Sequence, residues 1–220
     1  MRELCRCSLA FGMTSAHAPQ ATGHTTTHVL YLHGFRSSPQ STKARQVAAV
    51  MASEFPHITW WCPQLPPSPQ ATAALIADGT IHWPADGMAV IGSSLGGFYA
   101  TWLATQRGCK AVLLNPAIDP ARDLAKYIGE QTAWHDPAER FYFAPEFVDE
   151  LRRLQAAALP HPERAWALIA KGDEVLDWRE MTARYPGSHQ VVMEGGNHAI
   201  SNFEQYLPQM LEFLNLREAT

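Results

Sequence analysis

The sequence predicts an α/β domain in which a mostly parallel sheet of about six strands is covered by helices on both faces. Six short apolar runs recur along the chain, helical periodicity lies between several of them, and some runs are apolar without alternation. Continuous apolar runs are typical of strands buried on both faces, and a strand–helix rhythm is typical of parallel sheets with right-handed crossovers. The predicted strands are Val29–Leu32, Ile58–Cys62, Met88–Ile91, Ala111–Leu114, Ala165–Ala170 and Gln190–Met193.

Three stretches between or after these strands carry the apolar spacing of a helix that buries one face. The apolar positions are Ala44, Val47, Ala48 and Met51 in the first stretch, Leu95, Phe98, Tyr99, Trp102 and Leu103 in the second, and Phe203, Tyr206, Leu207, Met210, Leu211 and Leu214 in the third. Each stretch is therefore predicted to pack as a helix against the sheet.

The composition argues against several classes of partner. The 220 residues carry a net charge of −4, and the basic residues are scattered, which disfavours nucleic acid and anionic membrane surfaces. Apolar runs stay shorter than the roughly 18 residues of a membrane span. The four cysteines have no zinc-type spacing and are too few for a disulfide framework. We therefore expect a cytoplasmic protein without metal or cofactor; the sequence does not indicate an oligomeric state.

The predicted domain covers residues 28–217, and residues 1–27 are predicted to be a disordered leader because they are mostly polar and lack a strand or helix period. The segment 117–163 interrupts the rhythm. It has no convincing strand, but it has helix-like stretches at Asp123–Gly129 and Pro145–Ala158. An insertion of this kind is expected to form a small helical cap over a site, the alternative being a pair of surface helices.

A catalytic motif follows the Met88–Ile91 strand. The residues Gly92-Ser93-Ser94-Leu95-Gly96-Gly97 form a Gly-x-Ser-x-Gly pattern between a predicted strand and a predicted helix, the context of a nucleophile elbow. Glycine is needed at Gly92 and Gly96 because a side chain beside so tight a turn would collide with its neighbours. The motif predicts an α/β-hydrolase fold with Ser94 as nucleophile, and the Leu95 N–H at the helix start as an oxyanion donor.

The expected partners of Ser94 follow in the order acid, then histidine. His198 comes after the last strand and is predicted to be the general base. Asp173 comes directly after the Ala165–Ala170 strand and is the favoured acid; Asp177 is the alternative, although it could instead cap a helix that begins near Trp178. Glu174 is a third choice.

The second oxyanion donor is expected in the turn after the first strand. In His33-Gly34-Phe35, Gly34 lets the backbone approach the substrate and the Phe35 N–H would face the oxyanion. The alternative is an ordinary glycine turn.

At these residues the sequence resembles the YqiA-type esterases, a small bacterial α/β-hydrolase family. The matching segments are Leu30–Phe35 with Ser37-Ser38-Pro39, Pro63–Pro67, Ile91–Leu103, Asn115-Pro116-Ala117, Gly172–Asp177 and Glu194–Ala199. They span about residues 28 to 215, and the leader departs from the pattern. The resemblance implies a minimal hydrolase sheet without the first two strands of larger relatives, and activity on short acyl esters or thioesters.

The sequence thus predicts a serine esterase that cleaves carboxylic, short-chain acyl esters through an acyl-enzyme, with a small-molecule ester or thioester as its partner. Two alternatives stay open. An acyl-CoA thioesterase would use the same triad, with Arg36, Lys43 and Arg45 near the CoA phosphates, although these residues also fit a solvated helix face. A catalytically silent binding protein would keep the fold without turnover.

Overall fold

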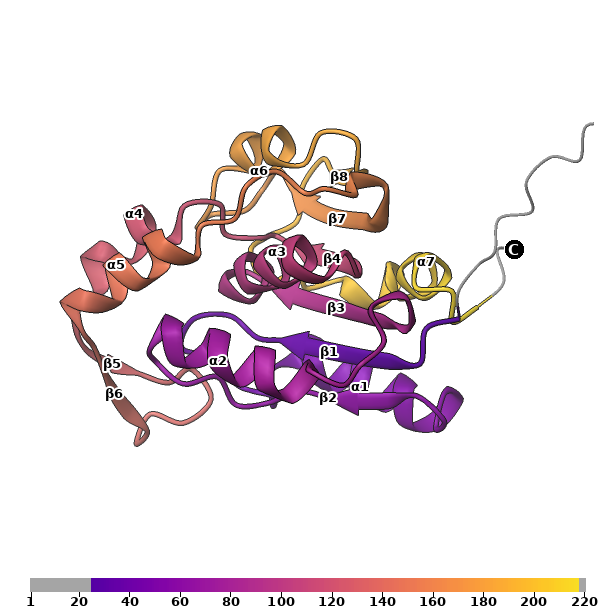
Figure 1. Ribbon diagram of the computed structural model, residues 1–220. Coiled ribbons are helices and arrows are strands. Elements are labelled where there is room, and N and C mark those ends of the chain that lie inside the picture. Colours follow the sequence, from indigo (N-terminus) through magenta and orange to yellow (C-terminus); the bar gives the residue numbers. More distant parts are fainter. Residues whose placement is uncertain (1–24, 218–220) are drawn as a thin grey trace, which may run out of the picture.

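The computed structural model describes residues 25–217, which form a six-stranded parallel sheet with helices on both faces (Figure 1). The strand order is β2-β1-β3-β4-β7-β8, and every neighbouring pair is parallel. The strands are β1 (His28–Leu32), β2 (Thr59–Trp61), β3 (Met88–Ser93), β4 (Lys110–Leu114), β7 (Ala165–Ala170) and β8 (His189–Met193). All six predicted strands are confirmed, with ends that differ by at most two residues.

Burial on both faces explains the continuous apolar strands. In β1, Leu30 and Leu32 belong to one core cluster, whereas Val29 and Tyr31 belong to the cluster on the other face. β3 and β7 are buried along their whole length. Because successive side chains of a strand point to opposite faces, a central strand buried on both faces is apolar along most of its length.

The helices are divided between the two faces of the main sheet. α1 and α7 contribute to the cluster that contains Val29, and α2, α3, α5 and α6 contribute to the cluster that contains Leu30. The α-helices are α1 (Thr42–Glu54), α2 (Pro69–Thr80), α3 (Leu95–Arg107), α4 (Pro120–Leu124), α5 (Pro145–Leu154), α6 (Trp178–Arg184) and α7 (Leu207–Phe213); the 3-10 turns are η1 (Ala85–Gly87), η2 (Ala125–Tyr127), η3 (Pro162–Arg164) and η4 (Phe203–Gln205). Within the described residues, no helix is both long enough and apolar enough to span a bilayer.

The third predicted helix is divided in two. The periodicity over 203–214 predicted one helix, but the structure has η4 followed by α7. Pro208 explains the division, because proline lacks an N–H donor and its ring would clash with the carbonyl of the residue four positions earlier. Pro208 is accommodated in the first turn of α7, where an N–H would have no partner.

The segment 117–163 is not purely helical, so the expectation that it holds no strand was wrong. β5 (Gly129–Thr132) and β6 (Arg140–Phe143) form an antiparallel hairpin between α4 and α5, and the helix-like stretch predicted to reach Gly129 ends in η2. Phe143 is the one buried residue of the two strands. Gly129–Thr132 has no apolar run, and the short aromatic run of Phe141, Tyr142 and Phe143 lies directly before the helix-like stretch that begins at Pro145, so the signal used to predict strands was weak here.

The insertion lies toward the carboxyl ends of the strands. In Figure 1, α4, α5, β5 and β6 gather on the side toward which the β1 and β3 arrows point. This edge of an open parallel sheet is where sites usually form.

The amino-terminal limit of the described chain falls inside the predicted leader. Residues 1–24 lie outside the described residues. Thr26, in contrast, is buried and its hydroxyl donates to the Leu214 carbonyl, and the Thr27 N–H donates to the Gly87 carbonyl. Hydrogen-bonded residues of the described structure therefore precede His28.

Candidate active site

Ser94 lies in a strained turn between β3 and α3. Its φ is 56° and its ψ is −120°, a backbone conformation that residues with a side chain rarely adopt. Neighbouring backbone groups hold it there. The Ser94 N–H donates to the Leu114 carbonyl at 3.0 Å, and the Ser94 carbonyl accepts from the N–H groups of Gly97 and Ala117 at 2.8 and 3.0 Å. The turn therefore presents the Ser94 side chain at the carboxyl edge of the sheet.

The two elbow glycines occupy positions without room for a side chain. A Cβ added at Gly92 would lie 2.2 Å from the Gly96 carbonyl oxygen, and one added at Gly96 would lie 2.0 Å from the Leu32 carbonyl oxygen. Both contacts involve backbone atoms that cannot rotate away. The packing of α3 against β1 and β3 thus requires glycine at both positions.

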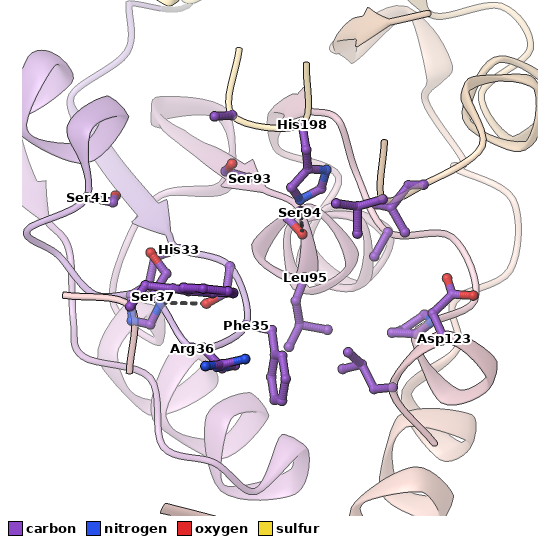
Figure 2. Close-up of a pocket in the computed structure, with 18 of the residues that line it drawn as sticks. His33, Phe35, Arg36, Ser37, Ser41, Ser93, Ser94, Leu95, Asp123 and His198 are labelled. Carbon is purple, nitrogen blue, oxygen red and sulfur yellow. Dashed lines mark hydrogen bonds between the residues drawn. The ribbon is translucent and has the colours of Figure 1, made fainter. Parts of the chain in front are cut away.

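A line of hydrogen bonds joins Ser94, His198 and Asp173. Ser94 Oγ lies 3.0 Å from His198 Nε2, and His198 Nδ1 lies 2.8 Å from Asp173 Oδ2 (Figure 2 shows the first of these contacts). Because a carboxylate can only accept, His198 Nδ1 carries the proton and Nε2 is left to accept from the serine hydroxyl. This tautomer is the one that a general base requires.

Asp173 is oriented by more than the histidine. Its side chain is fully buried, and its Oδ1 accepts from the Val175 and Leu176 N–H groups at 2.8 and 2.9 Å. One carboxylate oxygen is therefore held by the backbone while the other faces the imidazole.

The other two candidate acids make different contacts. Asp177 is the N-cap of α6, where its Oδ1 accepts from the Arg179 N–H at 2.9 Å. Glu174 accepts from the backbone N–H of His198 at 3.0 Å. Asp177 thus stabilises a helix end, and Glu174 positions the main chain of His198 rather than its ring.

The turn that carries Gly34 and Phe35 lies against Ser94. A Cβ added at Gly34 would lie 3.2 Å from Ser94 Cβ and 3.6 Å from Ser94 Oγ. Among the described residues, neither the Phe35 N–H nor the Leu95 N–H donates a hydrogen bond to another backbone group. Leu95 is the first residue of α3, where an N–H has no partner within the helix. Both donors are thus left available beside the serine.

His33 fastens this turn to the loop after β2. Its Nε2 accepts from the Leu65 N–H at 3.1 Å, so its Nδ1 carries the proton and donates to the Gly34 carbonyl at 3.0 Å. His33 is buried, and burial lowers the pKa of its imidazole. The neutral ring that these contacts require is therefore favoured.

A pocket of about 360 Å³ opens beside Ser94 (Figure 2). The insertion supplies one wall, including Leu124, Tyr127 and Trp134, and the residues after β1 supply another. A second pocket of about 350 Å³ shares Phe35 and Arg36 with the first. The Phe35 ring packs against three aromatic rings of the insertion, at centroid distances of 5.4 to 5.9 Å from Tyr127, Phe141 and Phe143.

Sequence reasoning assigned no role to Asn115, which links the two loops that carry His198 and Asp173. Asn115 is completely buried and has a φ of 41°. Its Nδ2 donates to the carbonyls of Asn197 and His198 at 3.1 and 3.2 Å, and its Oδ1 accepts from the Ala170 N–H at 2.8 Å. The available signal was an asparagine directly after a buried strand, at the edge where the site was expected.

The three basic residues considered for a phosphate groove separate in the structure. Arg36 and Lys43 line the pocket beside Ser94, whereas Arg45 is exposed on α1 and does not line it. No group of three or more His, Cys, Asp or Glu side chains able to hold a metal ion occurs in residues 25–217.

The fold recurs in solved structures of distant sequence. α/β hydrolase domain-containing protein 10 from mouse aligns with a TM-score of 0.64 and 16% identity, over 87% of this chain and 92% of that one. Est1E from Butyrivibrio proteoclasticus aligns with a TM-score of 0.60 and 14% identity, over 90% of each chain. Methylketone Synthase I from tomato aligns with a TM-score of 0.63 and 12% identity, over 87% of this chain and 99% of that one. At these identities, the likeness concerns the fold.

A family model covers nearly all of the described chain. The model described as "Uncharacterised protein family (UPF0227)" matches residues 28–215, the span over which the sequence motifs resemble the YqiA-type proteins. The chain therefore belongs to this family, the YqiA family of α/β-hydrolase fold.

Proposed function

We propose that this protein is a serine hydrolase that cleaves carboxylic esters with short acyl chains through an acyl-enzyme. The observation that carries the proposal is the hydrogen-bonded line from Ser94 Oγ through His198 to the buried carboxylate of Asp173. A serine hydroxyl is a weak nucleophile unless a base removes its proton, and a histidine oriented by a carboxylate is such a base.

In the proposed first step, Ser94 Oγ attacks the carbonyl carbon of the ester while its proton passes to His198 Nε2. The carbonyl oxygen becomes an oxyanion that accepts from the N–H groups of Phe35 and Leu95. Asp173 stabilises the imidazolium through Nδ1. When the tetrahedral intermediate collapses, the bond to the alcohol oxygen breaks and His198 returns the proton to the leaving alcohol.

The second step repeats this chemistry with water. His198 takes a proton from the attacking water, and a second oxyanion forms in the same place. When this intermediate collapses, the bond between the acyl carbon and Ser94 Oγ breaks, His198 returns the proton to Ser94 Oγ, and the carboxylic acid leaves. The pocket offers apolar contacts to an acyl chain, because Leu95, Leu124, Tyr127 and Leu176 line it.

The fold by itself does not carry the proposal. The neighbours include Est1E, the Pyrococcus furiosus esterase Pf2001 and a methylketone synthase. One fold hosts different chemistries, so the residues of the site rather than the fold support the function. A thioester would meet the same nucleophile and base, which leaves an acyl-CoA thioesterase as the second candidate.

The test is hydrolysis of p-nitrophenyl esters from acetate to palmitate by the wild type and by Ser94→Ala, with acyl-CoA thioesters assayed in parallel. We expect turnover of the short esters by the wild type and a loss of several orders of magnitude in Ser94→Ala. A preference for the thioesters would favour the second candidate. A wild type that neither turns over any ester or thioester nor reacts with a fluorophosphonate at Ser94 would leave a binding protein as the better description.

A further inference from the structure

The pocket beside Ser94 has walls of two kinds. The insertion and the loop after β7 supply mainly apolar side chains, namely Ala117, Pro120, Leu124, Tyr127, Val175 and Leu176, together with the charged Asp123 and Lys126. The chain that leaves β1 and enters α1 supplies polar and basic ones, namely Arg36, Ser37, Ser41 and Lys43. In Figure 2, Arg36, Ser37 and Ser41 lie on one side of Ser94 and Asp123 lies on the other. A ligand in this pocket therefore meets an apolar wall and a basic wall.

The charges on the pocket are predominantly positive. Arg36, Lys43 and Lys126 line it, and none of them forms an ion pair with a carboxylate within residues 25–217. Asp123 also lines the pocket; its Oδ1 is 2.8 Å from Arg122 Nε, and the same guanidinium pairs with Glu180 at 2.8 Å. The pocket thus presents cations without an anionic partner in contact.

Lys43 is the basic residue next to the reacting groups. Its Nζ donates to the carbonyl of Ala199, the residue after His198. An ammonium has three donors, so two remain after this bond. Burial lowers the pKa of Lys43 to about 8, even though the charge of Asp173 acts in the opposite direction. A charge that is partly withdrawn from water without an ion-pair partner is costly, and such groups concentrate at functional sites.

Arg36 is held in place on the same wall. Its Nε donates to the Thr132 carbonyl at 2.6 Å, and its guanidinium stacks 4.1 Å from the centroid of the Trp134 ring. These contacts use one of the five N–H donors of the guanidinium. The insertion therefore fixes Arg36 at the pocket while leaving donors for a ligand.

We infer that the pocket takes esters that carry a carboxylate on the part of the molecule facing Lys43 and Arg36, with the apolar part of the ester against Leu124, Tyr127 and Leu176. The carboxylate supplies the ion-pair partner that Lys43 lacks, and it places the scissile carbonyl beside Ser94. The inference rests on the proposed esterase function and specifies its substrate class.

The experiment compares matched esters that differ in one terminal group. On the acyl side, the monoethyl esters of succinate, glutarate and adipate are compared with ethyl butyrate, valerate and hexanoate. On the alcohol side, butyryloxyacetate and 4-(butyryloxy)butanoate are compared with ethyl butyrate and butyl butyrate. Acid release is followed in a pH-stat at pH 7. We expect the esters that carry a carboxylate to have a higher kcat/KM than their neutral matches in the acyl-side series, the alcohol-side series or both. The series that shows the preference identifies which side of the ester faces Lys43.

Two variants on α1 link the preference to Lys43. Lys43→Met keeps the apolar stem and removes the charge, and we expect it to lower the ratio of kcat/KM between the carboxylate and neutral members by about tenfold to a hundredfold, the range for a hydrogen bond to a charged group. Arg45→Met removes a charge from the exposed face of the same helix and is expected to leave the ratio unchanged.

Hydrolysis of neutral esters and labelling of Ser94 distinguish a wrong substrate class from a wrong proposed function. If neutral esters turn over and Ser94 reacts with a fluorophosphonate, but no carboxylate ester exceeds its neutral match, the substrate class is wrong and the esterase stands. An equal loss of preference in Arg45→Met would assign the effect to overall charge and overturn the role of Lys43. If no ester is hydrolysed and Ser94 is not labelled, the proposed function fails and this inference fails with it.

Discussion

The side-chain amide of Asn115 donates a hydrogen bond to the main-chain carbonyl of His198, at 3.2 Å. The same amide nitrogen donates to the Asn197 carbonyl, and Asn115 Oδ1 accepts from Ala170, the last residue of β7. One buried side chain thus connects the loop that carries the histidine to the strand that leads to Asp173. The positions of the base and the acid relative to Ser94 depend on this connection.

Replacement of Asn115 by aspartate should lower kcat with little change in KM. The aspartate keeps one oxygen that can accept from the Ala170 N–H. Its second oxygen, however, replaces the amide N–H₂ group and lies against the carbonyl oxygens of Asn197 and His198. The unsatisfied acceptors are expected to displace His198 and to lower kcat about tenfold or more. Ester kinetics and the rate of fluorophosphonate labelling measure the effect.

Asn115→Gly is the companion variant, because glycine adopts a φ of 41° without strain. It removes the side-chain bonds and is expected to lose kcat as well. A purely structural role would instead lower the melting temperature of both variants while kcat of the folded protein stayed at the wild-type value.

Asp173→Asn should reduce kcat by about four orders of magnitude, because an amide can donate to His198 Nδ1 and favour the wrong tautomer. Asp177→Ala is the matched control. It removes the N-cap of α6 and should cost about 1 kcal/mol of stability, with kcat close to wild type. Ester kinetics and urea denaturation of both variants are the measurements. A greater kcat loss in Asp177→Ala than in Asp173→Asn would contradict the assignment.

Gly96→Ala should strongly destabilise the protein. The added Cβ would lie 2.0 Å from the Leu32 carbonyl oxygen, so α3 or β1 must shift. We expect a loss of about 3 kcal/mol or more, at the upper end for overpacking in a core. Gly195→Ala is the control, since a Cβ at that exposed position meets no atom within 4 Å. Thermal unfolding distinguishes them, and equal melting temperatures would show that the elbow has more room than its geometry indicates.

The preference for carboxylate esters should decline as pH rises through about 8. The pKa of Lys43 is lowered by burial to about 8, so its charge is present below this pH and lost above it. The charge of Asp173 acts on Lys43, and Arg36, Asp123, Lys126 and His198 line the same pocket. Both members of an ester pair react through the same triad, so changes in the chemical step cancel in the ratio, and Arg36 stays charged.

Lys43→Arg tests the source of this pH dependence, because a guanidinium keeps its charge over the whole range. We expect its ratio of kcat/KM for carboxylate and neutral esters to stay level from pH 6 to 9. The same decline in Lys43→Arg and the wild type would exclude Lys43 as the titrating group.

The six strands of the main sheet were predictable because burial on both faces imposes apolar residues along the whole strand. The hairpin β5–β6 was not, since Gly129–Thr132 is mostly polar, and the aromatic run Phe141–Phe143 is only three residues long and adjoins the helical pattern from Pro145. The two strands are held together mainly by backbone hydrogen bonds to each other. Backbone pairing constrains the residue types of a strand less than burial does. The division at Pro208 was predictable from proline chemistry, although the apolar period over 203–214 suggested one helix.

By itself, the sequence determined the elbow around Ser94, the order of serine, acid and histidine, and the sheet that brings them to one edge. These features depend on local patterns of apolar and glycine residues, which can be read along the chain. Only the tertiary structure decided that Asp173 rather than Asp177 contacts His198, that Asn115 joins their loops, and that Lys43 but not Arg45 lines the pocket. Each of these depends on contacts between residues distant in sequence, and such contacts are set by strand register and helix packing.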